Sequence, residues 1–379
     1  MRSFYDFIHR PITLRTVEMC TYVTRELVVS EGVYALVRQR TGLPCGLSER
    51  QMYLHLRTVD GLEGWYGPLT RWSNVTGSTL AVVLRLLGRN ISIAGALKVL
   101  KPLWPRNPTS CAAVDCALWD LICRSERLRL WRAIAREGSA LKRDPPFYGS
   151  ALGLALEHVG VLVDVLAAGY PLAKWALNAQ KPIEEQLSKI MALHIGWDSI
   201  ALDAHGGLSV AQVKRIYHLA PGLCWLEDPF SSEDDHKWTR AGVEGNKRLP
   251  RLIVGEDVDS PERLEELAAY PAVHAVNLEV ERLGVTRAIL VIRSLKAQGR
   301  VCHLHGRALV PSSHLAIAYP DVARWVEIHL AFALERLATV RRGDSAFDPR
   351  EIVRYCLERE GLGVEPRGDM DCFVPEILL

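Results

Sequence analysis

Short apolar runs recur along the chain from Pro145 onward, each ending in polar residues and followed by a stretch with apolar residues at helical spacing. Eight such runs occur, at intervals of roughly 25 residues, which is the repeat length of a β/α barrel. An open doubly wound sheet would also alternate strand and helix, but it usually has a Gly-rich phosphate turn after its first strand, and Tyr148–Leu152 is not one. We therefore predict a barrel at residues 145–345. The runs are Pro146–Leu152, Pro171–Leu177, Ser199–Asp203, Leu223–Glu227, Leu252–Glu256, Val273–Glu279, Val301–His305 and Arg324–Glu327.

The first third of the chain has a different pattern, with strands and helices mixed. Gln51–Arg57 alternates toward a turn at residues 59–61, and Cys111–Ile122 has apolar residues at helical spacing. We predict a compact α+β domain at residues 1–140. In residues 346–379 the stretches of regular apolar and polar pattern are shorter. We expect this segment to pack back onto the first domain.

The amino-acid composition favours some classes of protein over others. With 379 residues, 49% of them apolar, the chain can bury a large core, and its net charge of +2 does not favour nucleic acid or a membrane surface as partner. Nine cysteines are scattered singly, which is typical of a reducing cytoplasm, and Met1–Thr13 lacks the apolar stretch of a signal peptide. No apolar run reaches the length of a membrane span. We expect a soluble, cytoplasmic protein.

Acidic residues stand at five of the predicted strand ends, and three of them, Asp203, Glu227 and Glu256, close consecutive strands. The strand ends of a barrel face one mouth, so three acids there would repel one another unless a cation neutralised them. Oxygen ligands with open positions suit Mg²⁺. Alternatively, each acid caps the helix that follows its strand. Asp257 replaces Glu256 as ligand if the strand ends one residue later.

Five segments together resemble the enolase superfamily, in its mandelate racemase and muconate-lactonizing enzyme branch. In the first domain, residues 57–65 (RTVDGLEGW) look like its hairpin and residues 115–121 (DCALWDL) like the helix that follows. In the barrel, residues 202–205 (LDAH), 225–229 (WLEDP) and 254–256 (VGE) match its three metal-ligand strands.

The resemblance implies a fold and a chemistry. The fold is an α+β capping domain over a (β/α)₇β barrel of the TIM type, in a homo-oligomer whose first domain closes the mouth of its own barrel. The chemistry is abstraction of a proton α to a carboxylate, with Mg²⁺ as cofactor. That proton is very weakly acidic because its loss adds a second charge to the same group, so coordination to the metal must stabilise the enolate.

Lys174 lies where the family commonly has Lys-x-Lys at the second strand end. Here the segment is Lys174-Trp175-Ala176, so the second lysine is absent. By resemblance, Lys174 lies beside the substrate carboxylate as a point charge. The alternative is a solvated lysine at a helix start.

The sixth and seventh strands are expected to provide the base. Cycloisomerases of the family have a lysine on the sixth strand, whereas this chain has Asn277-Leu278-Glu279, followed by a loop at residues 282–286. Racemases and acid-sugar dehydratases have an acid there that orients a histidine on the seventh strand, which matches Glu279 and His305. A carboxylate bound to an imidazole fixes its tautomer and raises its basicity. His305 and His303, on the same face, could instead be core residues.

His205 follows Asp203 by two residues. Many relatives have asparagine at this position, whereas dehydratases that resemble galactonate and mannonate dehydratase have histidine. It is either a general acid opposite His305 or a loop histidine facing solvent. We interpret the chain as a Mg²⁺-dependent dehydratase (a lyase) of a hydroxylated carboxylate, an acid sugar, with loops near residues 33–47 and 65–72 selecting the substrate. A racemase or epimerase, and a metal-binding relative without catalysis, are the alternatives.

Overall fold

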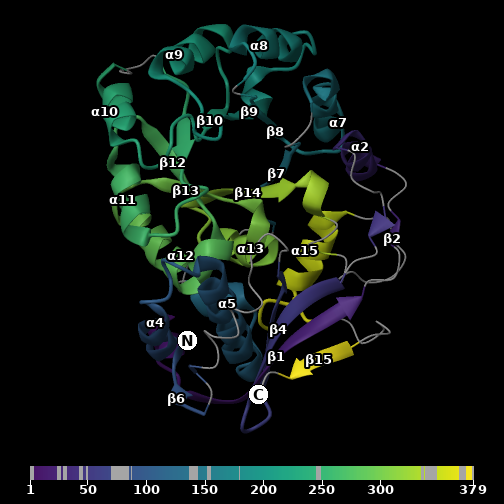
Figure 1. Ribbon diagram of the computed structural model, residues 1–379, viewed down its shortest axis with the longest axis vertical. Coiled ribbons are helices and arrows are strands. Elements are labelled where there is room, and N and C mark those ends of the chain that lie inside the picture. Colours follow the sequence, from purple (N-terminus) through teal and green to yellow (C-terminus); the bar gives the residue numbers. More distant parts are fainter. Residues whose placement is uncertain are drawn as a thin grey trace.

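The computed structural model describes most of the chain, namely residues 4–23, 27–28, 32–41, 46–47, 50–69, 85–86, 88–135, 144–151, 155–178, 180–244, 249–333, 337, 348–366 and 373–377. Two domains are visible in Figure 1, a barrel ringed by helices and a smaller domain with a twisted antiparallel sheet.

Eight parallel strands form the barrel, and they close in the order β10-β11-β12-β13-β14-β7-β8-β9. Each strand lies within one of the eight apolar runs predicted from the sequence, or extends it by one or two residues, so the predicted barrel is confirmed. The bounds are β7 (Phe147–Ser150), β8 (Ala173–Ala176), β9 (Ile200–Asp203), β10 (Trp225–Glu227), β11 (Leu252–Val254), β12 (Val273–Leu278), β13 (Val301–Leu304) and β14 (Ala323–His329).

Helices follow the strands and cover the outside of the barrel (Figure 1). Their bounds are η1 (Leu156–His158), α7 (Val161–Ala167), α8 (Ile183–Met191), η2 (Trp197–Ser199), α9 (Val210–Leu219), α10 (Asp235–Glu244), α11 (Pro261–Ala269), α12 (Val280–Ala297), η3 (Gly306–Ala308), α13 (Leu309–Ala318) and η4 (Leu330–Phe332). Residues 282–286, expected as a loop, lie within α12, which begins directly after β12 and consists of two helical stretches that meet in a kink at Gly284, where φ is 69°.

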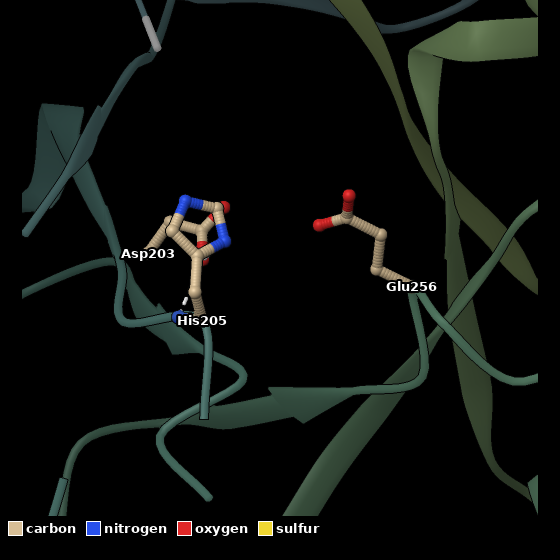
Figure 2. A group of neighbouring side chains, drawn as sticks. All are labelled: Asp203, His205 and Glu256. Atoms are coloured by element: carbon tan, nitrogen blue, oxygen red, sulfur yellow. Dashed lines mark hydrogen bonds and ion pairs between the residues drawn. The ribbon is translucent and has the colours of Figure 1, made fainter. Parts of the chain in front are cut away.

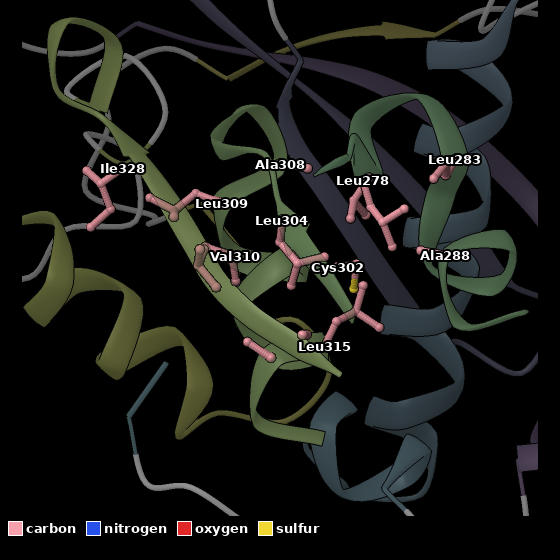
Figure 3. Packing of buried hydrophobic residues seen from close by; sticks show 14 of the residues in the cluster. Leu278, Leu283, Ala288, Cys302, Leu304, Ala308, Leu309, Val310, Leu315 and Ile328 are labelled. Atoms are coloured by element: carbon pink, nitrogen blue, oxygen red, sulfur yellow. The ribbon is translucent and has the colours of Figure 1, made fainter. Parts of the chain in front are cut away.

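Strand β13 shows how alternation separates core from site. Cys302 and Leu304 are fully buried and lie among apolar side chains of the surrounding helices, including Leu315 of α13 (Figure 3). Because side chains alternate across a strand, His303 and His305 face the inside of the barrel instead. The apolar helix contacts therefore fix the direction in which both histidines point.

The capping domain is built on an antiparallel sheet in the order β15-β1-β4-β5, with β6 paired to β1. The predicted hairpin is confirmed as β4 and β5, joined at residues 59–62, and the predicted helix is α5. The elements are α1 (Phe4–Ile8), β1 (Ile12–Val23), β2 (Leu27–Val28), α2 (Gly32–Thr41), β3 (Gly46–Leu47), β4 (Arg50–Thr58), β5 (Glu63–Leu69), β6 (Asn90–Ile91), α4 (Ile93–Leu100), α5 (Pro108–Ser125), α6 (Leu130–Ile134), α15 (Pro349–Leu357) and β15 (Phe373–Ile377).

Helix α5 joins the two domains by packing on α12. The buried carboxylate of Asp115 accepts hydrogen bonds from the Thr286 backbone N–H (2.8 Å) and hydroxyl (2.6 Å), and the Trp119 indole N–H donates to the same hydroxyl (2.8 Å). The break at Gly284 permits this approach, since a Cβ there would lie 2.7 Å from an Asp115 oxygen. Burial raises the pKa of Asp115 to about 6, against the hydrogen bonds from Thr286 that lower it.

The C-terminal segment links both domains. Its last described strand, β15, pairs antiparallel with β1 in the capping sheet, and the Leu362 backbone N–H donates to Asp120 of α5 (2.6 Å). On the barrel side, the imidazole of His314 in α13 lies 3.3 Å from the Leu362 carbonyl oxygen and accepts the Trp131 backbone N–H at 3.2 Å.

His314 is expected to make the fold sensitive to acid. Burial lowers its pKa from 6.5 to about 3, so below about pH 6.5 the unfolded chain binds a proton that the folded chain does not, and stability falls as the pH falls. Between about pH 7.5 and pH 5 this one group costs about 2 kcal/mol. Urea unfolding should show that His314→Gln removes that part of the acid-dependent loss, whereas the exposed His236→Gln leaves it unchanged. Equal losses in both variants would contradict this assignment.

Six cysteines have side chains in the described part of the structure. All six are free, and five of them are buried. Among the described helices, none combines the length and apolar character needed to cross a membrane.

Candidate active site

Acidic side chains gather at the carboxyl-terminal end of the barrel. Asp203 and Glu227 end the neighbouring strands β9 and β10 in register, and Glu256 follows β11 by two residues. All three side chains are buried. Asp257, the alternative to Glu256, is 76% exposed and forms an ion pair with Arg282 at 3.0 Å, so Glu256 joins the cluster and Asp257 does not.

Lys174 lies at the centre of these acids. Its side chain is completely buried on β8, and its Nζ is 2.6 Å from Glu227 Oε1, 3.1 Å from Glu327 Oε1 and 3.2 Å from Asp203 Oδ2. Only the contact with Glu227 has hydrogen-bond geometry, so Asp203 Oδ2 and Glu327 Oε1 are buried oxygens without a hydrogen bond from a described residue. The solvated helix-start interpretation of Lys174 is therefore wrong.

Negative charge exceeds positive charge at this mouth. Burial raises the pKa of Glu227 to about 8, against the lowering effect of Lys174 and with the support of Asp203 and other acids. Burial likewise raises the pKa of Asp228, with Glu227 as the next cause. Six carboxylates gather here, those of Asp203, Glu227, Asp228, Glu256, Glu279 and Glu327, and the described basic groups that lie beside them are Lys174, His205, His305 and Arg307. An excess of carboxylates is the condition under which a site gains from a further cation.

Two groups of side chains have the donor atoms and spacing of a metal site. Asp203, His205 and Glu256 form one group, and Glu227, Asp228 and Glu256 form the other, with all ligand atoms of a group within 4.8 Å of one another. Figure 2 shows the carboxylate of Glu256 directed toward Asp203 and His205. The donors are mainly carboxylate oxygens, the ligands that Mg²⁺ prefers. The three acids predicted as ligands are divided between these groups, which share Glu256.

His305 is held by carboxylates on both sides of its ring. Its Nδ1 lies 2.5 Å from Glu279 Oε2, and its Nε2 lies 3.2 Å from both Glu256 Oε1 and Glu327 Oε2. Burial alone would lower the pKa of His305, but Glu256, Glu327 and Glu279 outweigh it and raise the pKa well above 6.5.

Each carboxylate oxygen of Glu279 has its own partner. Its Oε1 accepts the Glu281 backbone N–H at 2.9 Å and so caps α12, while Oε2 faces His305. A glutamate at this position therefore reaches the imidazole without leaving its own helix start.

His205 lies at the rim of the site. It follows β9 in a left-handed backbone conformation with φ of 46°, and its side chain is 52% exposed. Its Nδ1 is 3.2 Å from Asp203 Oδ1, which also accepts its backbone N–H at 3.2 Å. The ring is thus half in solvent and half in the acid cluster.

Three residues at the mouth were not predicted as site residues from the sequence. Glu327, at the eighth strand, contacts both Lys174 and His305. Arg307 lies 3.2 Å from Glu256 Oε1, and the Asn277 side-chain amide donates to Glu227 Oε1 at 3.0 Å. The signal for Glu327 was present, because it ends the last apolar run, but no local motif connects it with the other acids.

Only part of the expected substrate loops lies within the described residues. Trp65 is buried and stacks on His55 within the capping sheet, with ring centroids 3.8 Å apart, so it contributes to the packing of that domain. Residues 42–45 and 70–72 and the side chain of Tyr34 lie outside the described residues.

Fold and site define a capped, eight-stranded β/α-barrel protein with a carboxylate cluster at the barrel mouth that could bind a metal. Residues 161–370 match the family model described as enolase C-terminal domain-like. The chain belongs to the enolase superfamily, in its mandelate racemase and muconate-lactonizing enzyme branch, as predicted from its motifs.

Individual relatives differ in their reactions. An L-Lys-D/L-Arg epimerase of Methylococcus capsulatus is 24% identical over 335 residues, 83% of this chain and 90% of that protein. The structure of L-talarate/galactarate dehydratase from Salmonella typhimurium LT2 aligns with a TM-score of 0.67 at 18% identity, over 97% of this chain and 92% of the other. An enolase from Bradyrhizobium, complexed with magnesium and mandelic acid, aligns with a TM-score of 0.65 at 18% identity, over 86% and 90% of the two chains.

Proposed function

We propose that this protein is a Mg²⁺-dependent dehydratase of a hydroxylated carboxylate, an acid sugar. One observation carries the proposal: two imidazoles adjoin the same carboxylate, Glu256. His305 Nε2 is 3.2 Å from Glu256 Oε1, and His205 belongs with Glu256 to one group of side chains within 4.8 Å. Loss of a hydroxyl β to an enolate needs a base for the α-proton and an acid for the leaving group.

His305 is the better base. Its Nδ1 lies 2.5 Å from Glu279 Oε2, which favours a proton on Nδ1 and leaves Nε2 as the nitrogen that can take the substrate proton. His205 is the better acid, because its half-exposed ring can take up a proton from solvent after each turnover.

Lys174 balances charge in this mechanism. Its contacts with Glu227 and Glu327 hold its pKa well above the ordinary value, although burial alone would lower it, so it stays an ammonium and is a poor base. From the same position it would attract the carboxylate of a substrate at the mouth.

Magnesium bound by Asp203, Glu227 and Glu256 would stabilise the negative charge that develops on the substrate enolate. It would also lower the pKa of His305 by neutralising Glu256, one of the three carboxylates near that ring. The magnesium in the Bradyrhizobium relative supports this cofactor.

A racemase or epimerase is the second candidate, and the Methylococcus relative supports it. Racemisation by two bases would need a second base opposite His305. Ala176 provides none, and Lys174 is held protonated, so His205 would have to abstract as well as donate protons. In the proposed dehydration, His205 only has to donate a proton.

The direct test is a panel of acid sugars incubated with the protein and Mg²⁺, with detection of 2-keto-3-deoxy products. We expect such a product from at least one of them, and its loss on addition of EDTA. Inversion of a substrate α-carbon without any keto product would establish the racemase instead.

Metal binding is predicted to depend on Glu227. Replacing it by glutamine removes a charged ligand from the second group and leaves Lys174 with one acid fewer. Calorimetry should show Mg²⁺ affinity reduced by roughly tenfold or more, while Asp257→Asn, a neighbouring exposed acid, should leave it unchanged. Unaltered affinity in Glu227→Gln would exclude this ligand assignment.

A further inference from the structure

A cavity lies at the end of the barrel opposite the acid cluster. Its volume is about 520 Å³, within the range of about 300–1,000 Å³ typical of small-molecule sites. The lining residues stand at the amino-terminal ends of β7 and β10 to β14, whereas the acid cluster stands at the carboxyl-terminal ends. They are Pro146, Cys224, Trp225, Arg251, Ile253, His274, Val301, His303, Arg324 and Trp325.

The charge of this cavity is opposite to that of the acid cluster. Arg251 and Arg324 are exposed, come from strand ends three positions apart around the barrel, and form no ion pair with a described residue. Among the described lining residues none is acidic. A guanidinium is always charged and presents donors in a planar fork that matches carboxylate and phosphate groups.

The inner wall is mostly aromatic and apolar. Trp225 and Trp325 have ring centroids 6.3 Å apart, and His303 packs edge-on against Trp225 at 4.6 Å. His303 is 4% exposed, and its Nδ1 is buried without a hydrogen-bond partner among the described residues. A buried imidazole nitrogen left unpaired is costly unless something polar meets it.

We infer that this cavity is a second ligand site, which takes a small organic anion with a flat, apolar body. Arg251 and Arg324 would hold the carboxylate or phosphate head at the rim, the tryptophans would pack on the ring, and His303 would hydrogen-bond a polar atom of the body. The inference does not rest on the proposed dehydratase activity, because the two sites share no residue.

One contact connects the two ends of the barrel. The Trp225 indole N–H donates to Glu227 Oε2 at 3.2 Å, so a residue of the cavity wall contacts a residue of the acid cluster directly. A metal bound to Glu227 would act on the cavity wall through this contact. Binding in the cavity is therefore measured with the acid cluster free of metal.

The test uses the full chain in EDTA, with benzoate and phenyl phosphate as separate probes followed by calorimetry and saturation-transfer NMR. We expect saturable binding of one probe, which identifies a carboxylate or a phosphate head. Arg251→Gln and Arg324→Gln should each weaken it roughly tenfold or more. His305→Asn at the other mouth and the exposed Arg215→Gln should leave it unchanged.

Two results would overturn the inference. One is the absence of saturable binding of either probe up to about 10 mM, in the millimolar range of the weakest specific complexes. The other is binding that is lost in His305→Asn but kept in both arginine variants, because the probe would then occupy the acid-cluster mouth. Since Arg251 and Arg324 are exposed, neither substitution is expected to prevent folding, and thermal unfolding of each variant checks this.

Discussion

His305→Asn is expected to abolish both turnover and the exchange of the substrate α-proton with deuterated solvent. In the proposed mechanism His305, 2.5 Å from Glu279, is the base that removes this proton, so without its imidazole the enolate is not expected to form. Loss of general base catalysis costs about 10²- to 10⁴-fold. NMR of the substrate in D₂O measures exchange, and the formation of keto product measures turnover.

His205→Asn is the matched variant. It should lose turnover but keep measurable exchange, because the enolate still forms while its leaving group is not protonated. Equal loss of exchange in both variants would favour a two-base racemase, and unchanged turnover in His205→Asn would leave that residue without a catalytic role.

Lys174→Met should destabilise the folded protein by about 3–5 kcal/mol near neutral pH, the usual cost of removing one partner from a buried ion pair. Lys174 is fully buried within 3.2 Å of Asp203, Glu227 and Glu327, and methionine has a similar shape without the charge. Chemical unfolding of both proteins in EDTA measures the difference.

The pH dependence of that loss identifies its cause. Without the ammonium, the carboxyl groups of Asp203, Glu227 and Glu327 have raised pKa values in the folded state. They then hold protons that the unfolded chain has already released, so the loss of stability grows as the pH rises. Saturating Mg²⁺ should reduce it. The control is Lys296→Met, an exposed lysine 3.5 Å from Asp321, which should change stability by no more than about 0.5 kcal/mol. A deficit independent of pH and of Mg²⁺ would indicate lost packing instead.

The barrel was predictable because each strand is a short apolar run with its own helix after it, so local pattern alone contains the repeat. The three strand-end acids were predictable for the same reason, since a strand end is a local property. Glu256 and Asp257 could not be separated in this way, because they differ by one residue and only the direction of the chain after β11 turns one inward and the other toward Arg282.

The centre of the site was not predictable from local pattern. Lys174, Glu227 and Glu327 come from β8, β10 and β14, which are separated around the barrel, and their contacts depend on how far each side chain reaches across it. Residues 282–286 were expected as a loop for a related reason. The kink at Gly284 divides them between two helical stretches, and it brings Thr286 to Asp115 of another domain, a contact that local pattern does not contain.

Pairing of β15 with β1 has a consequence for synthesis on the ribosome. On one side, residues 18–22 pair with residues 373–377, so this part of β1 lacks its partner strand until translation has passed the whole barrel. An unpaired strand edge is a template for association with other chains. Chains truncated before residue 373 should therefore aggregate through β1, and light scattering of such a truncated chain beside the full chain measures this.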